Sequence, residues 1–416
     1  MQDKVHKHLD GGGIGGNHAG DNQQSSLNPS HHHGSNNNNT PPFPIDRPDD
    51  PTPLIPQPGQ QPPGPGQLPP RVAKTDYTDR PIFYHPSGRR HNTMRDLGFT
   101  GVLDGRSIWS WGDTLMGTEH QAHICAVDST TIGSMRAPMH SVDTALQGGE
   151  MVANLVPLTR EEDGEGGYSC FSFGGTNIVE VAPGQGIVFY LKMHRPGGVY
   201  KCHGAGVGTC SLGPGSVPRV HRPFDTMWND TEPTWGDVGI CLDARDDHIY
   251  VYGHGPHNDP SGQELNSFTY LARVPRDKAL DIDSYSYYLA STGTWTSQRL
   301  ATGAWGTLAC KKEDALFGWH AMNQSAPFWS NYFNCWMLLH SSGWPDSPVL
   351  CKTAEKLEGP WEDRGEVATT LPEAQRGGKG MRECVTAHPE FEPSGRRVLV
   401  TWTRENVIWG VWIEWA

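Results

Sequence analysis

The sequence lacks three features that would place it in familiar classes of protein. It contains no apolar run of about 18 residues, the length that a membrane-spanning helix needs, so we expect no membrane span. It lacks an excess of basic residues, since the formal net charge is −13, and this argues against a nucleic-acid partner, which requires a basic surface. Its N-terminus, MQDKVHKHLDGGG, also lacks the apolar segment of a signal peptide.

The first 80 residues lack tryptophan altogether, although the chain has 15. Their only aromatic residues are Phe43 and Tyr77, and they hold 14 of the 34 prolines. Such a segment cannot bury enough apolar surface to offset the entropy of ordering. We therefore predict two parts: a disordered low-complexity tail with a Pro-rich linker over residues 1–74, and a folded domain over residues 75–416.

Cysteine is not abundant, and its nine positions do not form a metal-binding pattern. Cys202, His203 and Cys210 lack a fourth ligand and the usual spacing of a zinc site, so we predict neither a metal nor another cofactor. Cys202 and Cys210 flank the glycine-rich stretch HGAGVGT, which would allow a local disulfide if the protein is exported. Three cysteines in strand-like runs are expected to be buried small apolar side chains: Cys241, Cys310 and Cys335.

Helical hydrophobic periodicity is almost missing after residue 80. Short runs of aromatic and β-branched residues recur instead between Gly, Pro, Asn and Asp, as in SIWSWGD, GIVFYLKMH and HIYVYGHG. This pattern predicts an all-β domain, either a sandwich or a closed ring. Trp-Gly pairs at residues 111, 235, 305 and 409 are weak internal repeats that favour the ring. At about 65 residues per four-stranded blade, the domain would form a five-bladed β-propeller.

The dipeptide Asp104-Gly105 separates two strand-like runs, residues 96–103 and 106–113. Asp-Gly in this position predicts a two-residue type I′ turn, because both central residues need a positive φ. The turn sets the register and predicts these facing pairs: Leu103–Arg106, Val102–Ser107, Thr100–Trp109, Gly98–Trp111 and Asp96–Asp113. Two facing carboxylates repel each other by roughly 3 kcal/mol at an effective dielectric of about 20, so a purely structural strand pair would avoid them.

A glycosidase uses such a pair of carboxyl groups. One acts as nucleophile or base and the other protonates the leaving oxygen, and carboxyl groups about 5–5.5 Å apart indicate retention of anomeric configuration. Repulsion between Asp96 and Asp113 would raise the pKa of one of them and so supply the acid. Which of the two is the nucleophile stays open. In the structural alternative, Asp113 caps a turn with Thr114, and Asp96 pairs with Arg95 or Arg106.

Several segments together resemble a known family. They are, in chain order, Asp96-Leu-Gly, Gly-Asp-Thr at 112–114, Lys352-Thr-Ala-Glu, Leu357-Glu-Gly-Pro-Trp361, and His388-Pro-Glu-Phe followed by Leu399-Val-Thr-Trp402. Over residues 75–416 the chain thus resembles the domain-of-unknown-function 4185 family, now partly classed as glycoside hydrolase family 183. The characterised members are endo-D-arabinanases, so the resemblance implies a five-bladed propeller with its site at the channel mouth. It also implies two catalytic aspartates, which match Asp96 and Asp113.

Two further regions are candidates for substrate binding. Trp109 and Trp111 share a face with the aspartates in the predicted register, so either indole could form a platform for a sugar ring. Alternatively they pack in the core, with Trp111 covering Gly98. The segment 228–237, WNDTEPTWGD, could supply a third acidic group, for which we select Asp237; the alternative is a solvated turn.

The C-terminal third contains two more pairs of candidates. Asn323 and Gln324 adjoin the aromatic-rich stretch SAPFWSNYF and could bind sugar hydroxyls. His388 and Glu390 match the family pattern in the HPEF segment, so a substrate contact is predicted for them. Alternatively, the histidine only holds the last blade closed.

The sequence therefore predicts a glycoside hydrolase that cleaves arabinofuranosyl linkages of an arabinan-like polysaccharide or oligosaccharide, with retention, through Asp96 and Asp113. The alternative is a non-catalytic carbohydrate-binding or cell-surface adhesion propeller. The chemistry favours an extracellular or cell-surface location although no signal peptide is visible, and a cytoplasmic location is the alternative. The sequence makes no prediction of the oligomeric state.

Overall fold

The computed structural model describes most of residues 54–416, and residues 1–53 lie outside the described part. Within that range these segments also lie outside it: 79–91, 119–120, 126–128, 134–140, 144–145, 148–150, 153, 196–198, 200, 214–217, 304–305, 319–323, 342–347, 371–381 and 405–406. In the strands within residues 92–96, 113–152, 382–383 and 407, the backbone alone is described.

The described chain is almost entirely β-structure, as its aromatic and β-branched runs predict. Five of its sheets have four or more strands. The first sheet contains β2 (Asn92–Leu103), β3 (Arg106–Thr118), β4 (Gln121–Cys125), β5 (Ser129–Gly133) and β6 (Ser141–Asp143). The second contains β9 (Phe171–Gly175), β10 (Val179–Ala182), β11 (Gln185–His194), β12 (Lys201–Leu212), β13 (Pro218–His221) and β14 (Trp228–Asn229).

The other three large sheets follow in chain order. The third contains β15 (Thr234–Asp243), β16 (His248–His254), β17 (Thr269–Pro275), β18 (Ser286–Leu289) and β19 (Thr294–Thr296). The fourth contains β22 (Phe328–Ser330), β23 (Cys335–Ser341), β24 (Pro348–Ala354) and β25 (Glu362–Thr369). The fifth contains β26 (Arg382–His388), β27 (Arg397–Arg404), β28 (Val407–Trp415) and, from the other end of the chain, β1 (Val72–Tyr77).

The remaining elements are short. Two small ladders pair β7 (Leu146–Gln147) with β8 (Met151–Val152) and β20 (Leu300–Ala301) with β21 (Leu308–Ala309). In the described part of the chain, the α-helix α2 spans Arg160–Gly164. Single 3₁₀ turns are η2 (Gly167–Ser169), η5 (Leu265–Ser267), η6 (Arg276–Lys278), η7 (Ile282–Ser284), η8 (Lys312–Asp314) and η10 (Pro389–Phe391). Among the described residues, no helix has the length and apolar character needed to cross a bilayer.

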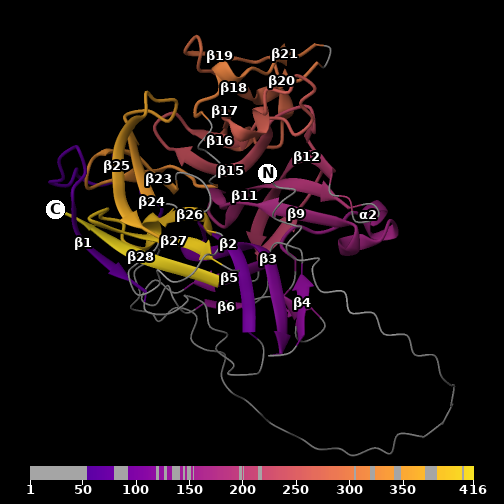
Figure 1. Cartoon of the computed structure of the whole chain (residues 1–416), viewed down its shortest axis with the longest axis horizontal. Helices are drawn as coiled ribbons and strands as arrows, with labels where there is room; N and C mark the ends of the chain where they lie inside the picture. The colour runs from indigo at the N-terminus through magenta and orange to yellow at the C-terminus, as the bar shows by residue number, and fades with distance from the viewer. Residues whose placement is uncertain are drawn as a thin grey trace, which may run out of the picture. The chain divides into compact units, whose positions relative to one another are not determined.

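The large sheets have a propeller-like arrangement. Each is built mainly from antiparallel neighbours that follow one another along the chain, which is how propeller blades form. In Figure 1, β2, β15 and β26 lie near the middle of the group of sheets, whereas β19 and β25 lie farther out. An all-β, propeller-like fold is thus present, and side chains on the middle strands are positioned to meet.

Apolar side chains fill the space between neighbouring sheets. One buried cluster joins the second and third sheets, and its largest members include Phe189, Trp228, Ile249, Tyr270 and Tyr285. Another joins the fourth and fifth sheets and includes Met337, Leu339, Val400, Trp402 and Ile413. Burying each such side chain contributes about 1.5–3 kcal/mol, so packing between sheets stabilises the arrangement and fixes where the middle strands lie.

The two ends of the described chain meet in the fifth sheet. β1 pairs antiparallel with β28, from Val72 opposite Trp415 to Tyr77 opposite Val411. Pairing of an N-terminal strand with a C-terminal sheet ties the ends of the unit together.

The end of the Pro-rich segment before β1 is also attached to the sheets. The amide of Gly64 donates to the carbonyl of Asn331 (2.8 Å), and the Gln57 side chain accepts from the amide of Ala244 (3.1 Å). The predicted linker boundary at residue 74 is therefore too late, because glycine at position 64 lets this segment lie directly on the backbone of Tyr332.

The predicted hairpin turn is confirmed. Asp104 and Gly105 have φ values of 51° and 70°, as a type I′ turn requires. The pairs nearest the turn are those predicted: Leu103–Arg106, Val102–Ser107 and Thr100–Trp109. Farther along, the predicted register fails, because Leu97 rather than Gly98 pairs with Trp111.

Of the two cysteine predictions, burial is confirmed and the local disulfide is wrong. Cys241, Cys310 and Cys335 are buried, as predicted. The loop expected between Cys202 and Cys210 is part of the extended strand β12 instead. At about 3.3 Å per residue the two cysteines lie about 26 Å apart along the strand, far beyond the reach of a disulfide, and neither forms one.

Candidate functional site

The first strands of three sheets carry irregularities at which the backbone leaves regular pairing. β2 shifts register on both sides of Leu97, which has a φ of 66°. β15 shifts beside Gly236 (φ 86°), and β26 shifts at Cys384 (φ 55°). Bulges re-aim side chains and are frequent beside active sites, where strained backbone also concentrates. Two candidate acids, Asp96 and Asp237, each adjoin one of these irregularities.

The irregularity in β15 places Asp237 in a hydrogen-bonded group. Its carboxylate accepts a hydrogen bond from Nδ1 of His254 (2.7 Å) and another from Nε2 of Gln324 (3.1 Å). Oε1 of Gln324 in turn accepts from the thiol of Cys384 (3.2 Å). These four residues, here called the Asp237 cluster, join the third sheet to the segment before β22 and to β26. Side chains from two sheets and from the segment that leads into the fourth sheet therefore converge at this point.

The surroundings of Asp237 keep it ionised. Its side chain is buried, and burial alone would raise the pKa of the carboxyl. The hydrogen bond and charge of His254, the charge of His257 and the amide of Gln324 outweigh that effect, so the pKa lies below its ordinary value. An ionised carboxylate can accept a proton or stabilise positive charge, but it cannot act as an acid at neutral pH.

The other acids of the segment 228–237 have different surroundings. Glu232 is buried and forms an ion pair with Arg299, with Oε2 and Nη2 at 2.5 Å. Asp230 accepts a hydrogen bond from the side chain of Asn258 at 3.4 Å. Of the three acids in this segment, the structure places Asp237 in the group that joins the sheets.

The predicted catalytic pair lies on the first hairpin. The paired residues on either side of it are Arg95–Thr114 and Leu97–Trp111. Between these pairs β2 contributes one residue, Asp96, and β3 contributes two, Gly112 and Asp113. The backbone therefore sets Asp96 across from a two-residue bulge rather than from Asp113 alone. The side chains of Asp96 and Asp113 lie outside the described residues, so their catalytic role stays a prediction.

Trp109 and Trp111 belong to the core. Their exposed fractions are 0% and 1%, and their rings stack at a centroid distance of 5.2 Å and an angle of 11°. Trp109 also lies 4.6 Å from the ring of His388, and Trp111 covers Gly98. Covered rings offer no platform for a sugar, so the packing alternative corrects the predicted role in substrate binding.

His388 and Glu390 are completely buried between the fifth and first sheets. The His388 ring lies 2.7 Å from the hydroxyls of both Thr100 and Thr401, and burial lowers its pKa to about 3. The hydroxyl of Ser107 donates to Oε1 of Glu390 at 3.2 Å. These bonds connect β26 and η10 to β2 and β3, which is the closing role that the sequence left as an alternative for His388.

Asn323 lies outside the described residues, whereas its neighbour Gln324 belongs to the Asp237 cluster. Two members of that cluster, His254 and Cys384, were not predicted from the sequence. His254 ends the strand-like run HIYVYGH, so a polar residue at a strand end was an available signal. No such signal marks Cys384, whose strand reads as an ordinary β-run.

The described residues do not assemble a metal centre. No group of three or more His, Cys, Asp or Glu side chains among them is arranged to hold an ion. The Asp237 cluster offers one carboxylate, one imidazole, one amide and one thiol, and these are bonded to one another.

Comparison with known proteins supports the fold. No family model matches the chain, and no curated protein sequence matches it. The resemblance to the domain-of-unknown-function 4185 family therefore stays a prediction. Among solved structures, the chain is similar to a candidate hydrolase of Bacteroides ovatus ATCC 8483, with a TM-score of 0.53 and 18% identity over 76% of this chain and 85% of that one.

Two characterised glycosidases are more distant. An exo-β-1,3-galactanase of Phanerochaete chrysosporium has a TM-score of 0.44 and 11% identity over 82% of this chain and 64% of that one. An endo-arabinase of Bacteroides thetaiotaomicron VPI-5482 has a TM-score of 0.37 and 12% identity over 82% and 97%. Of the three, the Bacteroides ovatus protein supports the fold assignment, and at 18% identity it supports the fold alone.

Proposed function

We propose that this protein is a glycoside hydrolase acting on arabinofuranosyl linkages of an arabinan-like polysaccharide or oligosaccharide. The observation that carries the proposal is the backbone of the first hairpin. A type I′ turn at Asp104 and the bulge beside Leu97 set Asp96, on β2, across from Gly112 and Asp113 on β3. Strain next to an acid is expected where a side chain is aimed for function.

We further propose that the five large sheets are the blades of one closed propeller. Hydrogen bonds link the sheets in order, through Thr176 between β9 and β10 and Gln324 before β22, and link the fifth sheet to the first. They are Ser110 Oγ to Thr176 O (2.6 Å), Thr176 Oγ1 to Gly236 O (2.8 Å), Gln324 Nε2 to Asp237 Oδ1 (3.1 Å), Cys384 Sγ to Gln324 Oε1 (3.2 Å), and the contact of Thr100 Oγ1 with His388 Nδ1 (2.7 Å). Such a ring places Asp96 and Asp237 on inner strands of the same channel.

In the proposed reaction, one of Asp96 and Asp113 attacks the anomeric carbon while the other donates its proton to the leaving oxygen. The glycosyl ester that forms is then hydrolysed by water, whose proton returns to the second carboxylate, and the configuration is retained. Asp237, held ionised by His254 and Gln324, would stabilise the positive charge that develops on the sugar ring.

The test is hydrolysis of arabinans by the full chain and by Asp96→Asn and Asp113→Asn. Loss of an acid–base group should lower the rate by about 10²–10⁴-fold. Asp104→Asn is the matched control, because it removes a carboxylate from the same hairpin at a turn position that Asn tolerates, and it should keep full activity. NMR of the first product reports its anomer, and retention is expected. Full activity in both Asp96→Asn and Asp113→Asn would refute the proposal.

Non-catalytic carbohydrate binding is the second candidate. It predicts that the unmutated chain binds arabinan in an affinity measurement and releases no oligosaccharide. Release of oligosaccharide that depends on Asp96 and Asp113 would exclude it.

A further inference from the structure

A cavity lies between the third and fourth sheets, next to the Asp237 cluster. Its volume is about 500 Å³, within the range of small-molecule sites. One wall comes from strands of the third sheet and residues 316–318, and the other from the fourth sheet and the loop 357–361. Two of the lining residues are Val238 and Ser325, which directly follow the cluster members Asp237 and Gln324 in the sequence. The cluster residues themselves do not line it.

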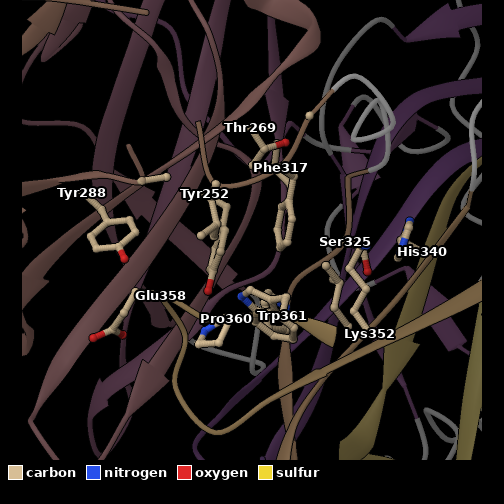
Figure 2. A pocket seen from close by; sticks show the side chains of 17 residues that line it. Tyr252, Thr269, Tyr288, Phe317, Ser325, His340, Lys352, Glu358, Pro360 and Trp361 are labelled. Carbon is tan, nitrogen blue, oxygen red and sulfur yellow. The ribbon is translucent and has the colours of Figure 1, made fainter. Parts of the chain in front are cut away.

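Four aromatic side chains form much of the cavity wall. Figure 2 shows Tyr252 between Tyr288 and Phe317, with Trp361 below Phe317. The rings of Phe317 and Trp361 are 5.9 Å apart at an angle of 63°. The hydroxyl of Tyr252 (3.2 Å) and the indole nitrogen of Trp361 (3.0 Å) both donate to the carbonyl of Leu357. These bonds hold two of the rings in place before any ligand enters.

The cavity also contains hydroxyl groups without partners. Thr269 is 0% exposed, and its Oγ1 has no hydrogen-bond partner in the described structure. Leaving such a group unbonded costs about 1–3 kcal/mol. Near the mouth, no hydrogen bond in the described residues satisfies the hydroxyl of Tyr288. Burial, together with the nearby charge of Glu358, raises the pKa of that hydroxyl, so it remains protonated and able to donate.

The charges around the cavity select against an anion. Lys352, which lines it, forms an ion pair with Asp363, so its positive charge is compensated. Glu358 also lines the cavity, and among the described residues it has no ion-pair partner. The carboxylate of Glu358 therefore leaves the cavity with negative charge, and a negatively charged ligand would be repelled.

We propose that this cavity binds one ring of a neutral saccharide. The C–H faces of a sugar fit the rings of Phe317 and Trp361, whose π-faces carry negative charge. Sugar hydroxyls both donate and accept, so they can satisfy the hydroxyl of Tyr288 and the carboxylate of Glu358. A quaternary ammonium ion would also suit the rings, but it would leave the Tyr288 hydroxyl unbonded.

The saccharide site does not depend on hydrolysis, because it is inferred from residues of the third and fourth sheets and from neither proposed catalytic aspartate. It adds a place where a glycan can be held besides the proposed catalytic pair. Asp96→Asn should therefore lose hydrolysis and keep binding at the cavity. This separates failure of one proposal from failure of the other.

Calorimetric titration of the full chain with xylobiose, mannobiose, lactose and arabinobiose tests the site, with tetramethylammonium chloride as the competing probe. At least one disaccharide should bind, and Tyr288→Phe and Glu358→Gln should each raise its Kd by about fivefold to tenfold. Glu355→Gln is the matched control, since Glu355 lies three residues from Glu358, is exposed and does not line the cavity. It should leave the Kd unchanged.

Thr269→Val should unfold at an unchanged or higher temperature and leave the Kd unchanged, because the hydroxyl that it removes has no partner and is fully buried. The proposal is overturned if no disaccharide of the panel binds, if the bound disaccharide is indifferent to both Tyr288→Phe and Glu358→Gln, or if tetramethylammonium displaces it.

Discussion

Two buried glutamates on different sheets show how surroundings decide a charge. Glu162, in α2, is 3% exposed, and Glu390, in η10, is 0% exposed. Glu162 lies 2.6 Å from the ammonium of Lys192 and 2.8 Å from the guanidinium of Arg222. Glu390 has no cationic partner among the described residues and receives hydrogen bonds from hydroxyl groups, including that of Ser107.

The pKa values of the two groups move in opposite directions. Burial raises the pKa of both carboxyls. For Glu162, hydrogen bonds from Arg222, Lys192 and the Thr159 amide more than reverse this and lower the pKa to about 2. For Glu390 the bonds from hydroxyls are too weak to do so, and the pKa is about 7. Similar burial thus gives an ionised carboxylate in one place and, in the other, an acid that keeps its proton up to about pH 7.

The largest loss of stability is expected on replacing Glu162, because its partners are two buried cations. Glu162→Gln would leave Arg222 and Lys192 buried without their shared carboxylate, and breaking a buried ion pair from one side costs about 3–5 kcal/mol. Urea unfolding at neutral pH measures this loss. Glu161→Gln, at an exposed neighbouring position, is the control and should change stability little. A loss below about 1 kcal/mol for Glu162→Gln would show that Asp225 alone satisfies the cations.

Replacing Glu390 should stabilise the protein, whereas replacing Glu162 should destabilise it. A pKa raised from 4.5 to about 7 means that folded Glu390 keeps its proton while the unfolded chain has lost it. Folding therefore takes up a proton between these pH values, and stability falls as the pH rises through them. Gln cannot ionise. The free energy of unfolding of Glu390→Gln, relative to that of the unmutated chain, should therefore rise by up to about 3 kcal/mol from pH 4 to pH 8.

This difference is measured by urea unfolding of both proteins at each pH. His388 titrates with the opposite sign, since its pKa is lowered to about 3 by burial, but it is present in both proteins and cancels from the difference. A constant stability difference across the range would mean that Glu390 is ionised when folded, contrary to the comparison.

The smallest effect concerns the backbone support of Glu162. Thr159 caps α2: its hydroxyl accepts from the amide of Glu162 (3.2 Å), and its own amide donates to the Glu162 carboxylate (2.7 Å). Thr159→Ala removes the cap and should cost about 1 kcal/mol. Thr159→Ser keeps the hydroxyl and should restore most of the loss in the same thermal unfolding measurement. Equal losses in both variants would assign the effect to the methyl group instead.

Much of the fold follows from local sequence signals. The turn at Asp104 and the aromatic runs predicted a hairpin and an all-β domain, because turn chemistry and period-2 patterns act over a few residues. The glycine-rich stretch between Cys202 and Cys210 misled the prediction for a tertiary reason. Gly204 and Gly206 belong to a strand and are needed because the backbone of Trp228 and the ring of Tyr190 pack directly against them.

The site was less predictable because it depends on neighbouring sheets. The bulge beside Leu97 leaves no mark in the hairpin sequence, and it shifts the pairing of Trp111 by one residue. The indole of Trp109 is covered by His388 and Phe391 from the fifth sheet, which spacing along one hairpin does not reveal. Asp237 and Gln324 were each selected, but their contact joins residues 87 positions apart.

The most direct measurement is the initial rate of oligosaccharide release from arabinan by the unmutated chain, Asp96→Asn, Asp113→Asn and Asp104→Asn, with unfolding temperatures recorded for all four. We expect release by the unmutated chain and by Asp104→Asn. In Asp96→Asn and Asp113→Asn the rate should fall by about 10²–10⁴-fold at an unchanged unfolding temperature. Equal release by all four would contradict the proposed function.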